Sequence, residues 1–209
     1  MVKIIPTIFS HNKKEFNERF KKLLSISNNF QIDFMDGKFV PSKSINLKEI
    51  PNLKKFRKNF EAHLMCLHPE KYLSQLKKKG FKKTIFHIES TRSLEEVIKK
   101  IKSFKLIPFM AINPETHLEK ILSHISSVKG ILFMGVHPGK EHQKFIPSVY
   151  KKISQLRKLN KKIIVQVDGG VNESVAKKLA KLKVSIINSG SYISDSENPR
   201  ETLRKLKSL

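Results

Sequence analysis

The chain has 209 residues, of which 39% are hydrophobic and 29% are charged, a composition that suits one globular domain with a substantial core. Because it has no apolar run of roughly 20 residues and a single cysteine, Cys66, neither a membrane-spanning helix nor a disulfide framework is expected. Only six of the 42 basic residues behind the net charge of +24 are arginines, so the charge favours a lysine-rich surface over specific nucleic-acid recognition.

Eight short runs rich in β-branched and aromatic residues have the pattern of buried strands. They cover residues 2–9, 30–35, 59–65, 83–88, 106–112, 130–136, 162–167 and 184–189. The first run lacks the separate basic region and the cleavage site of a signal peptide. Together with the single cysteine, this predicts a cytoplasmic protein.

Seven amphipathic stretches with helical period lie between and after these runs. They cover residues 13–26, 69–79, 93–104, 114–125, 148–159, 173–182 and 199–209. Prolines at the first turn and polar N-cap residues mark several helix starts, namely Pro69, Pro114, Pro199, Ser93 and Asn172. The segment between the second and third strands is the weakest candidate for a helix, because Pro51 interrupts it.

The strict alternation of strands and helices predicts parallel strands joined by right-handed crossovers. Eight such units within residues 1–209 favour a single (β/α)8 barrel, the TIM-barrel fold, over a doubly wound open sheet. A dinucleotide-binding fold has no support, because no G-x-G-x-x-G motif follows the first strand.

Reactive groups of such a barrel gather where the strands end. Gln31, Asp33 and Met35 alternate along the second strand, so they share one face, and Asp168 ends a strand on the opposite side of the barrel. Two carboxylates across a bound substrate suit the removal of a proton on one face and its return on the other. His63 offers an imidazole to a divalent metal, which can stabilise an enediolate.

Glycines after the last two strands suggest a phosphate site. Gly169 and Gly170 follow the seventh strand, and Gly190 and Ser191 follow the eighth. Barrels commonly bind phosphate at this place with backbone N–H groups. A small phosphorylated substrate is therefore expected.

Segments along nearly the whole chain carry a family pattern, namely IIPTIFS, QIDFMDGKFVPS, EAHLM, FHIES, INPET, FMGVHPGKEHQKFIPSVYKKI, QVDGGVN and NSGSYI. In this order they resemble the ribulose-phosphate 3-epimerases. The resemblance implies a metal-dependent 1,1-proton transfer at C3 of a ketose phosphate, which interconverts D-ribulose 5-phosphate and D-xylulose 5-phosphate. It also implies a homo-oligomer, at least a dimer.

The resemblance assigns roles to individual residues. Asp33 and Asp168 would be the two acid/base groups. A divalent ion such as Zn, Fe or Mn would be held by Gln31, Asp33, His63 and Asp168. The substrate would contact Thr7, Met35, Met65, Met134, Gly139, Gly169, Gly170, Gly190 and Ser191.

Three positions depart from the family pattern. Gln31 stands where the family has its first histidine ligand, and it either coordinates the metal through its oxygen or hydrogen-bonds Asp33 or the substrate. The glycine-rich run after the sixth strand is Gly139–Gln143, which has lost two glycines, and Lys140 or His142 could supply charge there instead. Thr7 replaces a serine.

Two alternatives to an active epimerase stay open at this level. One is a diverged barrel that binds a sugar phosphate with an altered or lost metal site and a different reaction. The other is a basic nucleic-acid-binding protein, whose affinity would fall steeply with salt. Outside the site, we expect Asp36 and Gly37 to form a turn, and we expect His87 either to have a structural role or to support a metal ligand without contacting the metal.

Overall fold

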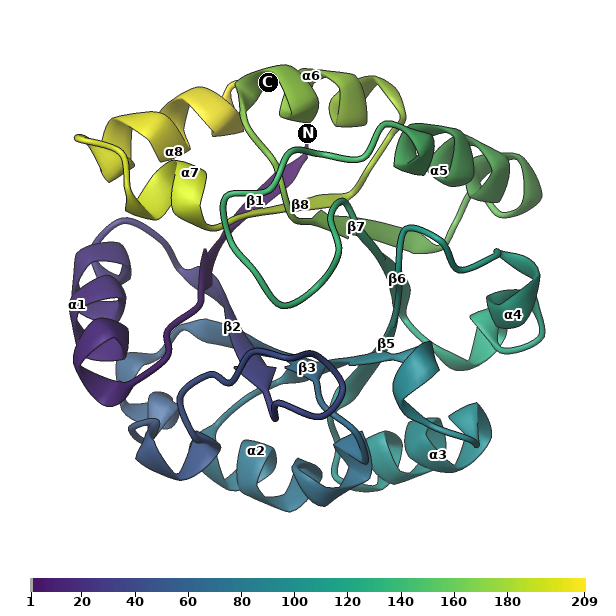
Figure 1. Cartoon of the computed structure of the whole chain (residues 1–209), viewed down its shortest axis with the longest axis horizontal. Coiled ribbons are helices and arrows are strands. Elements are labelled where there is room, and N and C mark those ends of the chain that lie inside the picture. Colours follow the sequence, from purple (N-terminus) through teal and green to yellow (C-terminus); the bar gives the residue numbers. More distant parts are fainter. Residues whose placement is uncertain (1) are drawn as a thin grey trace.

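The computed structural model describes residues 2–209. Eight parallel strands close into a barrel in the order in which they occur along the chain (Figure 1). The strands are β1 (Lys3–Ile8), β2 (Asn29–Met35), β3 (Asn59–Met65), β4 (Lys83–His87), β5 (Ile107–Ile112), β6 (Gly130–Met134), β7 (Ile164–Asp168) and β8 (Ile186–Ser189). Pairing of β1 with both β2 and β8 completes the ring. The predicted (β/α)8 barrel is confirmed.

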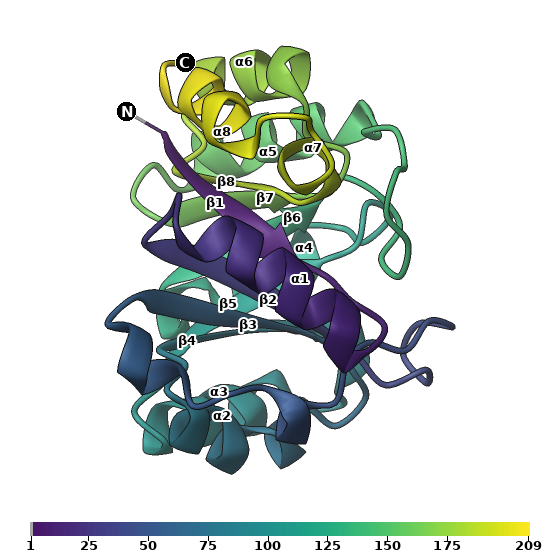
Figure 2. The same cartoon turned by 90° about the vertical axis from the view of Figure 1, so that its left-hand side faces the viewer.

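Helices surround the barrel and cover the outer faces of its strands (Figures 1 and 2). They are α1 (Lys13–Leu24), α2 (Leu73–Lys79), α3 (Leu94–Ser103), α4 (Glu119–Leu122), α5 (Ser148–Leu159), α6 (Glu173–Lys181), α7 (Ser191–Ser194) and α8 (Pro199–Lys207). The predicted caps are present, because Ser93 accepts from the Glu96 N–H at 3.3 Å and Asn172 accepts from the Val175 N–H at 2.9 Å.

The predicted helix over 114–125 is wrong in its first half, where the chain forms a turn and α4 begins only at Glu119. The Glu89 carboxylate accepts the Asn113 N–H at 2.9 Å and the Thr116 hydroxyl. Lys152 Nζ donates to the Thr116 carbonyl at 2.6 Å. Lys152 thus takes the Thr116 carbonyl, which a helix would pair internally, while Glu89 holds the start of the segment through Asn113 and Thr116, and a turn replaces the first half of the helix.

Two further segments differ from regular helix. The region interrupted by Pro51 forms two short 3-10 turns, Leu47–Glu49 and Leu53–Phe56, in agreement with its weak helical pattern. The short helix α7, directly after β8, has no apolar period and was not predicted. It places Ser191 at the end of the barrel where the site lies.

The barrel interior is divided into an apolar and a polar half. Inner faces of β4, β5 and β6, together with Val136 just after β6, carry an apolar cluster, whose other members are Ile85, Phe109, Ala111, Leu132 and Met134. Polar side chains from β2, β3, β4, β7 and β8 fill the other half, and those that are almost completely buried include Gln31, Asp33, Glu61, His63, Lys83, Gln166, Asp168 and Asn188. The polar half is where the chemistry is concentrated.

Candidate active site

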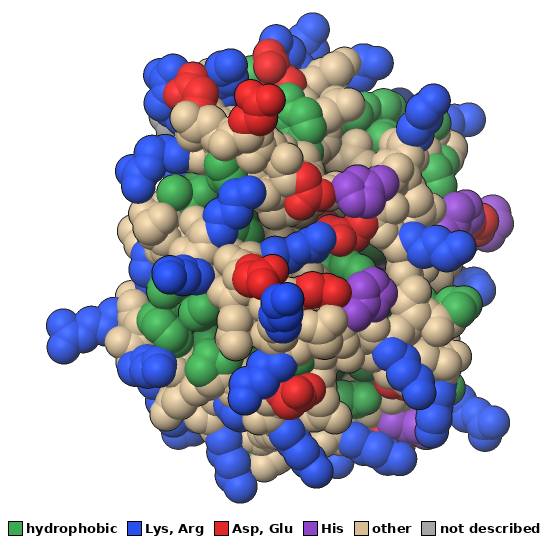
Figure 3. All heavy atoms as spheres, turned by 60° about the vertical axis from the view of Figure 1, so that its left-hand side comes forward, with side chains coloured by type: hydrophobic (Ala, Val, Ile, Leu, Met, Phe, Trp, Pro, Cys, Tyr) green, Lys and Arg blue, Asp and Glu red, His purple; other side chains and the backbone are tan. Residues whose placement is uncertain are grey.

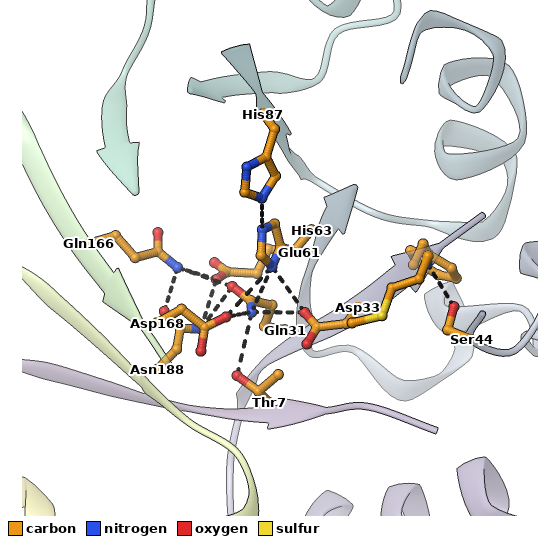
Figure 4. Close-up of polar contacts among 12 residues, drawn as sticks. Thr7, Gln31, Asp33, Ser44, Glu61, His63, His87, Gln166, Asp168 and Asn188 are labelled. Carbon is orange, nitrogen blue, oxygen red and sulfur yellow. Dashed lines mark hydrogen bonds and ion pairs between the residues drawn. The ribbon is translucent and has the colours of Figure 1, made fainter. Parts of the chain in front are cut away.

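Three side chains from separate strands converge inside the mouth of the barrel (Figure 4). Asp33 on β2 lies beside His63 on β3 in the strand register, and Asp168 at the end of β7 faces both from across the barrel. His63 Nδ1 is 3.2 Å from Asp33 Oδ1 and 3.6 Å from Asp168 Oδ2. One potential ligand atom of each residue lies within 4.8 Å of the others, so the three can hold a cation together.

Burial changes the acid–base behaviour of this cluster. Removal from water, reinforced by the charge of Asp168, raises the pKa of Asp33 to about 6, against the hydrogen bond from His63 that lowers it. Burial alone would lower the pKa of His63, but hydrogen bonds to Asp168 and Asp33 outweigh it and raise that pKa to about 9. A carboxyl group with a pKa near neutrality is well suited to general acid–base work.

Gln31 presents its amide nitrogen, not its oxygen, to this cluster. Nε2 donates to Asp33 Oδ1 at 3.0 Å and to Asp168 Oδ2, and it lies 3.5 Å from His63 Nδ1. Oε1 points away from the cluster and accepts from Asn188 Nδ2 at 3.0 Å. The geometry therefore favours the hydrogen-bonding alternative for Gln31 over coordination through its oxygen.

One pocket opens above the cluster, and all nine residues predicted to contact substrate line it. They are Thr7, Met35, Met65, Met134, Gly139, Gly169, Gly170, Gly190 and Ser191. Asp33, His63 and Asp168 line the same pocket, whereas Gln31 does not. Gly169 and Gly170 have φ of +98° and +66°, a backbone region that side chains disfavour, so their turn depends on glycine.

A loop between β6 and α5 crosses the end of the barrel (Figure 1), and its residues 138–143 line the pocket. Its Glu141 pairs with Arg19 of α1, whose Nη1 is 2.8 Å from Glu141 Oε2 and also donates to the Phe9 carbonyl at 2.8 Å. Glu141 Oε1 lies 3.8 Å from the position a Cβ would take at Gly190. A carboxylate thus lies at the end of the pocket where a phosphate is predicted.

The sequence offered no signal for this ion pair, because its members are 122 residues apart. Lys140 and His142 also line the pocket, and His142 is largely exposed, with Nε2 3.6 Å from Asp195. Figure 3 shows lysine and arginine side chains scattered over the visible face, while several acidic and histidine side chains gather around a hollow.

His87 contacts His63 on the side of its ring opposite to the carboxylates. Their rings stack with centroids 5.1 Å apart, and the two Nε2 atoms are 3.0 Å apart. Burial lowers the pKa of His87, so its neutral ring can accept a hydrogen bond at Nε2 from the Nε2–H group of His63. The structural role predicted for His87 agrees with this contact. Asp36 forms the predicted turn by accepting from the Lys38 and Phe39 N–H groups.

Comparison with known proteins identifies the family. The profile of the Ribulose-phosphate 3 epimerase family matches residues 3–194. The chain belongs to this family. A ribulose-phosphate 3-epimerase of Methanocaldococcus jannaschii is 31% identical, over 99% of this chain and 90% of its own length. One from Buchnera aphidicola is 33% identical, over 91% and 87%. The predicted family is confirmed, and as a member of it the chain is an enzyme of the isomerase class.

Solved structures agree with this epimerase-family fold at low sequence identity. A 3-hexulose-6-phosphate synthase from Salmonella typhimurium superposes with a TM-score of 0.76 at 13% identity, covering 99% of this chain and 97% of its own. KGPDC from Streptococcus mutans gives 0.75 at 12% identity, covering 100% and 96%. These likenesses support the barrel alone. Among residues 2–209, no helix has both the length and the apolar character to cross a membrane.

Proposed function

We propose that the chain is a ketose-phosphate 3-epimerase that interconverts D-ribulose 5-phosphate and D-xylulose 5-phosphate. The observation that carries this proposal is the pair of buried carboxylates, Asp33 and Asp168, which approach one pocket from opposite strands with His63 between them. Such a pair can reach both faces of a carbon atom held in the pocket. Inversion at C3 needs this arrangement, because the proton leaves on one face and returns on the other.

The two carboxyl groups exchange roles in the two directions of the reaction. Asp33, as the carboxylate, takes the C3 proton, and the electron pair of the C3–H bond moves toward the C2 carbonyl to form an enediolate. Asp168, in its protonated form, then donates its proton to the opposite face of C3. The raised pKa of Asp33 makes its carboxylate a stronger base for taking the C3 proton, and it keeps part of the group protonated near neutral pH, so that it can return a proton in the reverse direction.

The ligand atoms of Asp33, His63 and Asp168 fit a divalent cation of the Zn, Fe or Mn class, because two carboxylates and one imidazole are ligands such ions accept. When bound, the cation would supply positive charge to the enediolate oxygens. His63 must be neutral to serve as a ligand, so its proton leaves the site when a cation enters. Gln31 faces the same place with an N–H group.

The rest of the pocket suits the remainder of the sugar phosphate. Met35, Met65 and Met134 give the reacting carbons an apolar wall with adaptable side chains. Backbone N–H groups around Gly170 and Gly190 are the proposed phosphate contacts. Charge at this end comes from the loop that carries Lys140, Glu141 and His142.

The test is isomerisation in heavy water. The purified chain, freed of metal and then supplied separately with Mn²⁺, Zn²⁺ or Fe²⁺, should convert D-ribulose 5-phosphate to D-xylulose 5-phosphate and place deuterium at C3. A sample kept metal-free with chelator and a sample without protein are the controls. Absence of both product and deuterium with every metal would contradict the proposal.

A second candidate follows from two side chains. Glu141 brings a carboxylate to the predicted phosphate position, and Gln31 brings an N–H group to the predicted metal position. The candidate is a diverged barrel that binds a sugar phosphate without epimerising it. This candidate predicts saturable binding of D-ribulose 5-phosphate by calorimetry together with no deuterium at C3. The heavy-water measurement separates the two.

A further inference from the structure

A layer of hydrogen-bonded polar side chains lies in the barrel beneath the active-site cluster (Figure 4). Lys83 of β4 forms an ion pair with Glu61 of β3, and Lys83 Nζ also donates to Gln166 Oε1 at 2.7 Å. Gln166 and Asn188 connect this pair to Gln31. All five residues are at most 9% exposed, so the bonds among them replace water.

The direction of these bonds is set by Lys83. A lysine ammonium only donates, so Gln166 must turn its Oε1 toward Lys83 and its Nε2 the other way. That Nε2 donates to Glu61 Oε1 at 2.5 Å and to Asn188 Oδ1 at 2.6 Å. Because Asn188 Oδ1 accepts this bond, Asn188 Nδ2 is left to donate to Gln31 Oε1 at 3.0 Å.

Gln31 is the last member of this chain of bonds. Its Oε1 accepts from Asn188 and, at 3.4 Å, from Gln166 Nε2. Nε2 therefore faces Asp33 Oδ1 and Asp168 Oδ2, with His63 Nδ1 3.5 Å away. If the amide were turned over, Oε1 would meet two carboxylates and Nε2 would meet two N–H donors. Both ends would then lose their hydrogen bonds in a buried place, which is costly.

We propose that Gln31 is a fixed hydrogen-bond donor at the centre of the Asp33–His63–Asp168 cluster, and that Asn188 and Gln166 are positioning residues that hold it there. Its N–H group competes with a divalent cation for the same ligand atoms, so the natural chain binds metal more weakly than its three ligands alone would. This inference rests on the metal site of the proposed function and names the residues that regulate its affinity.

The experiment is a calorimetric titration of the metal-free chain with Mn²⁺. Gln31→Glu keeps the shape but replaces the donor by an acceptor, and it should raise affinity about 100-fold. The double variant Gln166→Leu/Asn188→Val removes the two donors that hold Gln31 Oε1, and it should raise affinity about tenfold. Val165→Ala, a buried truncation on the outer face of β7, is the control and should bind Mn²⁺ like the natural chain.

A second measurement needs no stable double variant. In the natural metal-free chain, the two side-chain amide protons of Gln31, assigned by their loss in Gln31→Glu, should be well dispersed and slow to exchange with water. An averaged, rapidly exchanging pair would overturn the inference, as would natural Mn²⁺ affinity in a folded Gln166→Leu/Asn188→Val variant.

Turnover of D-ribulose 5-phosphate, measured on the same samples, keeps the inference separate from the proposed function. If the expected order of affinities is found without turnover in any sample, the inference is supported and the proposed epimerase is contradicted. If turnover is found but all variants bind Mn²⁺ alike, the inference alone is overturned.

Discussion

The inner and outer ends of the pocket are built in different ways. At the inner end, Asp33, His63 and Asp168 sit on strands, are at most 7% exposed and share several hydrogen bonds. At the outer end, Glu141 and its neighbours sit on a loop, and the ion pair with Arg19 fixes the carboxylate. Strand register therefore fixes the inner groups, whereas the outer groups are held by side-chain contacts of a loop, among them the pairs Arg19–Glu141 and His142–Asp195.

We expect this difference to separate the chemical step from substrate selection. The inner groups cannot move without breaking the buried bonds that surround them, which suits proton transfer over short distances. The loop can exchange its ion pair for contacts to a ligand at little cost, because partly exposed pairs contribute little to stability. We expect substitutions at the inner end to change kcat and substitutions at the outer end to change KM.

The largest effect should come from the inner carboxylates. Asp168→Asn removes the group proposed to return the proton, and kcat should fall about 10³-fold or more, with a much smaller change in KM. Steady-state kinetics with D-ribulose 5-phosphate measure both constants. Asp36→Asn, a carboxylate change in the nearby turn, is the matched control. A kcat within about tenfold of the natural value in Asp168→Asn would contradict the assigned role.

A smaller effect is expected at the outer end. Glu141→Gly removes a negative charge from the predicted phosphate position and frees Arg19, so KM for D-ribulose 5-phosphate should fall about tenfold, because charges a few ångströms apart near a surface interact by about a few kcal/mol before screening. Glu141→Gln removes the charge but keeps the shape of the side chain, and it should give most of the decrease in KM. If kcat falls and KM does not, the loop acts in the chemistry and the two ends are not distinct.

The smallest effect concerns stability of the metal-free chain. The folded-state pKa of His63 lies above its ordinary value, at about 9. Its contribution to stability is therefore fully present below about pH 6.5 and is lost as the pH rises through about 9. The thermal midpoint should fall by roughly 5 °C between pH 7 and pH 9.5, since one pKa unit corresponds to about 1.4 kcal/mol.

His63→Asn is the control for the titration of other groups, because it should show a smaller decline over the same pH window. An equal decline in both proteins would mean that His63 is not the titrating group. Adding Mn²⁺ should reduce the decline in the natural chain, since a metal-bound His63 is already neutral.

Much of the fold and of the inner site follows from the sequence. Alternating runs predict the strands, and the polar residues at their ends, Asp33, His63 and Asp168, are where a parallel barrel must bring them together. The orientation of Gln31 is different, because it depends on Gln166 and Asn188, which approach only after β7 and β8 have closed the barrel.

Long-range polar contacts account for the other misses. The Arg19–Glu141 pair joins α1 to a loop far along the chain, and no periodic pattern records such a contact. The turn that replaces the first half of the helix predicted over 114–125 depends on Glu89 and Lys152, which come from other parts of the barrel. Local helix propensity carries no information about partners that are distant in the sequence.

The hydrogen bonds beneath Gln31 also constrain how the chain can change over time. An imidazole at position 31 has at most one acceptor nitrogen, so exchange to histidine alone would leave Asn188 Nδ2 and Gln166 Nε2 facing one acceptor where Gln31 Oε1 now accepts from both. We therefore expect exchange to histidine at position 31 to be accompanied by changes at positions 166 and 188. Relatives with histidine at position 31 should carry residues other than glutamine at position 166 and asparagine at position 188.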